Sequence, residues 1–74
     1  MAVTYSIHSG TPGEIPVEHT ASSVDAAKTT YRLWVIQASR IGNTYENSFM
    51  DVVDSRGNEH RYVPGSCIGS LRRV

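Results

Sequence analysis

The sequence predicts an α+β domain in which one long helix packs on one face of a small antiparallel sheet, in the order strand, strand, helix, strand, strand. Three observations favour this fold: apolar residues alternate with polar ones over residues 2–8, they recur every three or four positions over residues 24–41, and two short apolar runs flank a turn sequence at residues 54–58. Because 74 residues supply material for one core only, we expect residues 1–74 to form a single domain.

The start of the chain predicts a hairpin over residues 1–19. Its first strand is expected at residues 2–8, and residues 9–13 are a cluster of turn formers. Alternation resumes over residues 14–18, which predicts a second strand paired back on the first. Pro16 has no N–H to donate, so we expect the second strand to lie at an edge of the sheet.

A helix is predicted over residues 22–41. Ser22 stands three residues before Asp25, a spacing typical of a helix N-cap, and Gly42 suits the helix end. One apolar stripe should face the sheet, with Val35 beside it: Val24, Ala27, Tyr31, Trp34, Ala38 and Ile41. An alternative is also compatible with the sequence, because residues 31–36 are rich in β-branched and aromatic side chains and would suit a strand after a helix that ends near Thr30.

A second hairpin is predicted over residues 48–63, with a type I turn and a left-handed Gly57. This turn sets the register, which pairs Val53 with Glu59, Val52 with His60, Asp51 with Arg61, and Met50 with Tyr62. The register places Met50, Val52, His60 and Tyr62 on the core face. Residues 64–74 have too little periodicity for an element and are expected to form an irregular tail, with Ile68 and Leu71 covering one end of the core.

Composition argues against several functional classes. Seven cationic and seven acidic residues give a net charge of zero, although residues 28–74 carry all of the cations. Cys67 has no partner for a disulfide and is interpreted as a small buried apolar residue. The His and Cys spacings suit no metal site, and no stretch is apolar enough to span a membrane. We therefore expect a cytoplasmic protein without catalytic residues, metal or cofactor.

The outward side of the predicted helix offers a candidate contact patch. Leu33 and Ile36 fall away from the core stripe, in one row with Arg40 and beside Arg32. We take these four residues, together with Asp54 and Arg56 at the predicted hairpin tip, as the partner-binding site. Isolated exposed leucines are common on protein surfaces, and the row is also compatible with a homodimer.

The size and element order, from Val3 to Val63, resemble those of small phage-encoded inhibitors of bacterial immunity, the anti-CRISPR proteins. The resemblance implies a protein that binds a bacterial protein or ribonucleoprotein complex in the host cytoplasm and blocks its function.

A second hypothesis is a small nucleic-acid-binding accessory protein. Its phosphate contacts would come from Arg56, Arg61, Arg72 and Arg73. Zero net charge and the interleaved acidic residues give only weak attraction to a polyanion, which makes this the less favoured interpretation.

Overall fold

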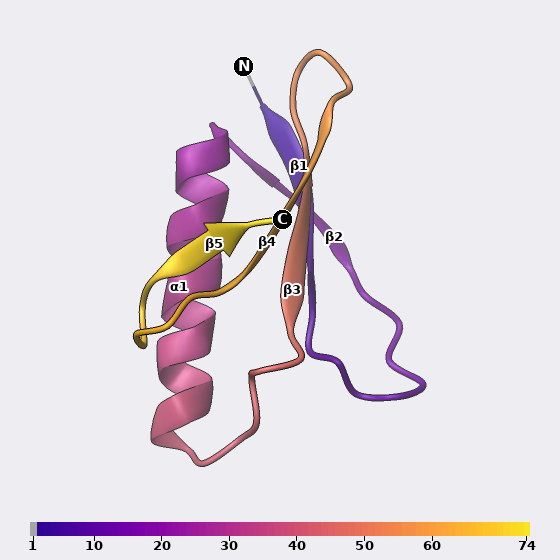
Figure 1. Cartoon of the computed structure of the whole chain (residues 1–74). Helices are drawn as coiled ribbons and strands as arrows, with labels where there is room; N and C mark the ends of the chain where they lie inside the picture. Colours follow the sequence, from indigo (N-terminus) through magenta and orange to yellow (C-terminus); the bar gives the residue numbers. More distant parts are fainter. Residues whose placement is uncertain (1) are drawn as a thin grey trace.

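The computed structural model describes residues 2–74, which form five antiparallel strands and one helix (Figure 1). The elements follow the chain as β1 (Val3–His8), β2 (Glu18–Ala21), α1 (Val24–Arg40), β3 (Phe49–Val53), β4 (Glu59–Pro64) and β5 (Leu71–Arg73). The sheet order is β2-β1-β3-β4-β5. The predicted α+β class with one helix is confirmed, but three strands follow the helix where two were expected.

The first strand lies where it was predicted, whereas the second does not. Strand β2 begins at Glu18, and residues 14–17 belong to the connection instead. Two glycines with positive φ, Gly10 and Gly13, shape this connection, and a Cβ on Gly10 would come within 2.8 Å of the Asn47 carbonyl oxygen. Strand β2 is an edge strand, as expected. It does not contain Pro16, because the connection is longer than predicted and includes the proline.

Helix α1 is continuous through residues 31–36, so the alternative strand in that region is wrong. Its N-cap is Ser23, one residue after the predicted Ser22, and the Ser23 hydroxyl accepts a hydrogen bond from the Ala26 N–H at 3.1 Å. At the other end Gly42 has a φ of +78°. The Gly42 N–H donates to Ser39 O and the Asn43 N–H to Ala38 O, the pair of bonds that defines a Schellman motif.

The core lies between α1 and the inner face of the sheet. The helix buries Ala27, Tyr31, Val35 and Ala38, and the strands bury Val3, Tyr5, Met50, Val52 and Tyr62. The buried stripe is therefore centred closer to Val35 than predicted. Trp34 is only partly buried and Ile41, the last predicted stripe residue, is 70% exposed.

The second hairpin has the predicted register at all four pairs. The Gly57 N–H donates to Asp54 O and the Asp54 N–H to Asn58 O, both at 3.0 Å, and Gly57 has a φ of +85°. These bonds make the expected type I turn followed by a glycine bulge.

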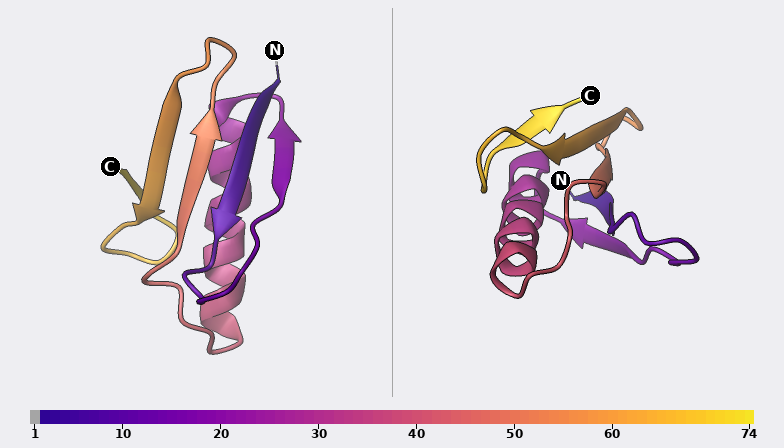
Figure 2. Two further views of the ribbon diagram at one scale, coloured as in Figure 1. Left: turned by 90° about the vertical axis from the view of Figure 1, so that its right-hand side faces the viewer. Right: turned by 60° about the horizontal axis from the view of Figure 1, so that its bottom comes forward.

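The tail is not irregular as predicted, because it returns as β5 along the outer side of β4. The Val74 N–H donates to Arg61 O and the Gly65 N–H to Ser70 O, both at 2.9 Å. Met50 pairs with Tyr62, and β3 begins only one residue before Met50. No residue of β3 therefore lies opposite Pro64, so the absence of an N–H on the proline costs no hydrogen bond to β3. The sheet curls toward the helix, which brings β5 close to α1 (Figure 2).

A buried chain of hydroxyl groups joins the helix to the start of β3. The Ser48 hydroxyl donates to Tyr45 O at 2.5 Å, so the Tyr31 hydroxyl, 2.7 Å from Ser48 Oγ, is the donor in the next bond. Burial raises the pKa of Tyr31, which keeps its hydroxyl protonated for this role. The two bonds fix the connection between α1 and β3 against the helix.

We predict that Tyr31→Phe lowers the free energy of unfolding by about 1 kcal/mol, because Ser48 Oγ loses its donor. Ser48→Ala should cost more, since it leaves the buried Tyr31 hydroxyl without an acceptor. Urea unfolding of both variants and of the double variant measures this. The double variant should lose less free energy of unfolding than the two single variants lose together. Equal losses would mean that the bond makes no contribution.

Candidate interaction surfaces

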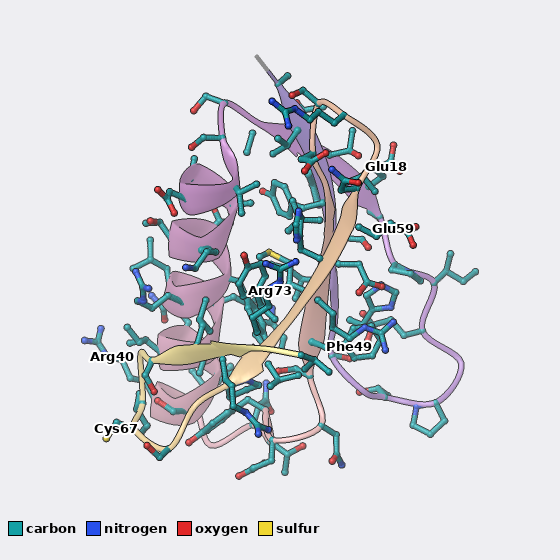
Figure 3. The ribbon with its side chains drawn as sticks, turned by 45° about the horizontal axis from the view of Figure 1, so that its top comes forward. Glu18, Arg40, Phe49, Glu59, Cys67 and Arg73 are labelled. Atoms are coloured by element: carbon teal, nitrogen blue, oxygen red, sulfur yellow. The ribbon has the colours of Figure 1, made fainter. Side chains whose placement is uncertain are left out.

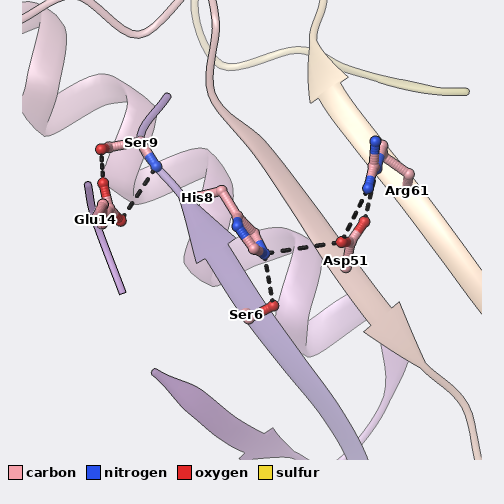
Figure 4. Close-up of polar contacts among 6 residues, drawn as sticks. All are labelled: Ser6, His8, Ser9, Glu14, Asp51 and Arg61. Atoms are coloured by element: carbon pink, nitrogen blue, oxygen red, sulfur yellow. Dashed lines mark hydrogen bonds and ion pairs between the residues drawn. The ribbon is translucent and has the colours of Figure 1, made fainter. Parts of the chain in front are cut away.

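The outer face of the sheet, which no helix covers, carries a polar cluster of four residues (Figure 4). His8 Nε2 lies 3.0 Å from Ser6 Oγ and 3.8 Å from Asp51 Oδ2, while Arg61 binds Asp51 through Nε at 2.8 Å and through Nη2 at 3.2 Å. A Ser-His-Asp catalytic relay requires the serine and the aspartate on opposite nitrogens of the imidazole. Here both use Nε2, so the cluster does not have that geometry.

The same face holds an aromatic side chain between two neighbours. The His8 ring stacks on Phe49 with the ring centroids 4.3 Å apart, and the Arg61 guanidinium lies 4.2 Å from the Phe49 centroid. Hydrogen bonds to Asp51 hold Arg61 in place and raise the pKa of its guanidinium. Phe49 and Arg61 are thus engaged with each other and with adjacent strands, which leaves them poorly placed for stacking on bases or binding phosphates.

Asp54, expected at a partner-binding site, instead caps the turn of the second hairpin. Its Oδ1 accepts the N–H groups of Arg56 and Asn58, both at 2.9 Å, and its Oδ2 lies 3.1 Å from His60 Nε2. The bond from His60 and those from the turn amides lower the pKa of Asp54 to about 2. His60, predicted on the core face, is about four-fifths buried, and its Nδ1 is buried without a hydrogen-bond partner among residues 2–74.

The helix row predicted to face outward does so in part. Leu33 is 58% exposed, whereas Ile36 is half-buried because residues 65–70 lie against it. A Cβ on Gly69 would stand 3.7 Å from Ile36 Cδ1 and 4.0 Å from Arg32 Cγ. The tail therefore packs against this part of the helix surface at Gly69.

Two tail residues are positioned differently from the prediction. Ile68 is 60% exposed instead of covering the core, and Cys67 is exposed instead of buried. Figure 3 shows Cys67 and Arg40 on the same side of the molecule. We name the combined area the helix–tail surface and define it by Arg32, Leu33, Ile36, Arg40 and Ile68.

The structure brings together four of the six predicted partner-binding residues. Arg32, Leu33, Ile36 and Arg40 share α1, while the turn that contains Asp54 and Arg56 lies at the end of the molecule opposite the C-terminal end of the helix (Figure 1). Ile68 is the contributor that sequence reasoning missed. Its hydrophobicity was visible, but the return of the tail along β4 was not.

The four arginines of the nucleic-acid hypothesis do not share one surface. Arg61 is paired with Asp51 on the outer face, and Arg56 lies in the hairpin turn. Within β5, Arg73 is opposite Tyr62 and Arg72 opposite Val63, so their side chains leave the sheet on opposite faces.

Folding sorts the charges more strongly than the sequence does. Helix α1 and strand β5 together carry five cations and one carboxylate, a formal charge of +4; the cations are Lys28, Arg32, Arg40, Arg72 and Arg73. The other residues carry two cations and six carboxylates, a formal charge of −4. None of the five cations forms an ion pair with a side chain of residues 2–74. The positive charge is therefore concentrated on α1 and β5, with Arg73 on the helix side of the sheet and Arg72 on its outer face.

No protein-family model matches the chain, and no curated protein or solved structure resembles it significantly. Among residues 2–74, no helix combines the length and the hydrophobicity that a membrane span needs. In the same part of the chain, no three His, Cys, Asp or Glu side chains cluster in a way that could hold a metal ion.

We predict that the bonds to Asp54 make stability depend on pH in the acid range. The pKa of Asp54 is lower in the folded state than its ordinary value of 3.8, so the ionised carboxylate stabilises the fold above about pH 4, and this contribution is lost as the pH falls through about 2. The melting temperature, followed by circular dichroism, should fall more steeply over this range for the wild type than for Asp54→Asn. Parallel curves for the two proteins would contradict the assignment.

Proposed function

We propose that this chain is a small interaction protein that binds a macromolecular partner through the helix–tail surface and thereby blocks the partner's function. The observation that carries the proposal is the exposure of two large apolar side chains, Leu33 and Ile68, on a surface that α1 and the tail build together.

The composition of the surface is that of a protein interface. Leu33 and Ile68 supply exposed apolar area, Ile36 and Arg32 lie against Gly69 next to Ile68, and Arg40 is on the same helix. Arginine is enriched in interfaces because its guanidinium makes several directed hydrogen bonds and packs well on apolar groups. Since neither arginine forms an ion pair with a side chain of residues 2–74, both are available to a partner.

The sign of the charge favours a partner whose surface is acidic. Helix α1 carries three cations and one carboxylate, a formal charge of +2, and Arg73 adds a further cation on the helix side of the sheet, so this side attracts carboxylates and speeds encounter with them. The resemblance in size and element order to phage-encoded inhibitors supports one particular partner, a bacterial defence complex in the host cytoplasm. We propose such a complex as the target.

The nucleic-acid alternative has less support, because its arginines are dispersed over the hairpin turn, the outer face and both faces of β5. The apolar centre of the helix–tail surface also suits a protein better than a phosphate backbone.

We expect Leu33→Asp to weaken partner binding about thirtyfold while the fold is retained. The side chain is mostly exposed, so its loss costs little stability, but a buried carboxylate at the centre of the interface should weaken binding by about 2 kcal/mol, roughly thirtyfold. Immobilised wild type and variant are compared for capture of a partner from bacterial lysate, followed by titration of the purified partner.

Ile15→Asp is the matched control, because Ile15 is 87% exposed and lies in the connection between β1 and β2. It should capture at least as much partner as the wild type does. Full capture by a folded Leu33→Asp variant would exclude the helix–tail surface as the binding site, and recovery of nucleic acid alone would favour the alternative function.

A further inference from the structure

Four of the six exposed large apolar side chains of residues 2–74 occur in two settings of opposite charge. Leu33 lies on the cationic helix α1, and Ile68 stands next to Gly69, which packs against that helix. Ile15 and Val17, which are 87% and 64% exposed, lie between Glu14 and Glu18 in the connection that leads into β2. We call residues 14–18, with the sequence Glu-Ile-Pro-Val-Glu, the acidic segment.

The acidic segment is well suited to binding as a short linear element. Residues 14–17 form no strand pair, and Pro16 restrains the preceding Ile15 to extended backbone. Such restraint reduces the entropy lost on docking. The Glu14 carboxylate accepts the Ser9 N–H at 3.3 Å and also binds the Ser9 hydroxyl, which ties the start of the segment to the end of β1.

The acidic segment complements the helix–tail surface in both respects. It offers two aliphatic side chains flanked by two carboxylates, and the helix–tail surface combines two exposed aliphatic side chains, Leu33 and Ile68, with two arginines on α1. Contacts between like parts are disfavoured, because two helix–tail surfaces would bring arginines together and two acidic segments would bring carboxylates together.

The two parts of one molecule are unable to meet. The connection that contains the acidic segment extends beyond the β2 edge of the sheet, on the side of the molecule away from α1 (Figure 2). Any contact between them must therefore join separate molecules.

We propose that the acidic segment of one copy docks on the helix–tail surface of a second copy. This contact uses the surface assigned above to the partner but requires no partner to form. Self-association therefore competes with partner binding and keeps the exposed apolar side chains covered when the partner is absent.

The contact is testable with the purified chain alone. A five-residue segment is much smaller than the roughly 20–30 residues a side of a standard stable interface, so we expect weak, concentration-dependent association. On dilution of ¹⁵N-labelled protein, amide shifts should change in residues 14–18, on the outward side of α1 and in residues 65–70. Sedimentation equilibrium should show an average mass that rises with protein concentration and falls with added salt, because salt screens the carboxylate–arginine attraction.

Two variants, alone and mixed, distinguish this contact from other modes of association. Ile15→Asp removes the docking side chain and Leu33→Asp removes the receiving one, so each variant alone should sediment as a monomer. In an equimolar mixture the intact segment of Leu33→Asp meets the intact surface of Ile15→Asp, and association should return through one contact per pair. Ile41→Asp changes an equally exposed residue outside both parts and should associate like the wild type.

The results separate this inference from the proposed function. Capture of the partner by Ile15→Asp with loss of self-association supports both proposals. Three results would overturn the self-docking contact: a wild type that stays monomeric at every concentration, a mixture that stays monomeric, or association that survives both single substitutions. None of these results affects the capture experiment.

Discussion

The structure depends on one requirement: a single helix must cover the inner face of a five-stranded sheet. Strands lie about 4.8 Å apart and a helix with its side chains is about 10 Å across, so a flat sheet of five strands would leave apolar residues exposed beyond the helix. The sheet instead curls around α1, and the stripe from Ala27 to Ala38 meets Met50 and Val52 at its centre. The curl brings β5 and the tail toward the helix, which creates the helix–tail surface.

Local interactions account for the parts of the fold that the sequence predicts. The turn at residues 54–58 has the glycine and aspartate that a type I turn with a bulge requires, and it determines the register of β3 and β4. The helix is predicted to within a residue or two at its ends, because capping depends on neighbouring residues. The strand alternative for residues 31–36 is excluded by the continuous buried stripe, which intrinsic β propensity does not outweigh.

Non-local interactions explain what the sequence does not predict. Strand β5 is three residues long and carries two arginines, so its conformation comes from pairing with β4 and not from any pattern of its own. The displacement of β2 to residues 18–21 likewise depends on where the connection passes Asn47. Leu33 was identifiable from helical periodicity, whereas Ile68 and the exposure of Cys67 depend on the path of the tail. The role of Asp54 was foreseeable from turn chemistry, since aspartate commonly binds backbone amides two residues on.

The pairing of β1 with β3 has a consequence for how the chain reaches this structure. The other strand pairs join neighbours in the chain order, but Thr4 meets Val53, which lies 49 positions further along a chain of 74 residues. Bringing such distant residues together carries an entropy cost that local contacts do not offset until the strands touch. The pairing of β1 with β3 therefore has the longest sequence separation of any strand pair in the sheet, and we expect its closure to be the slow step of folding.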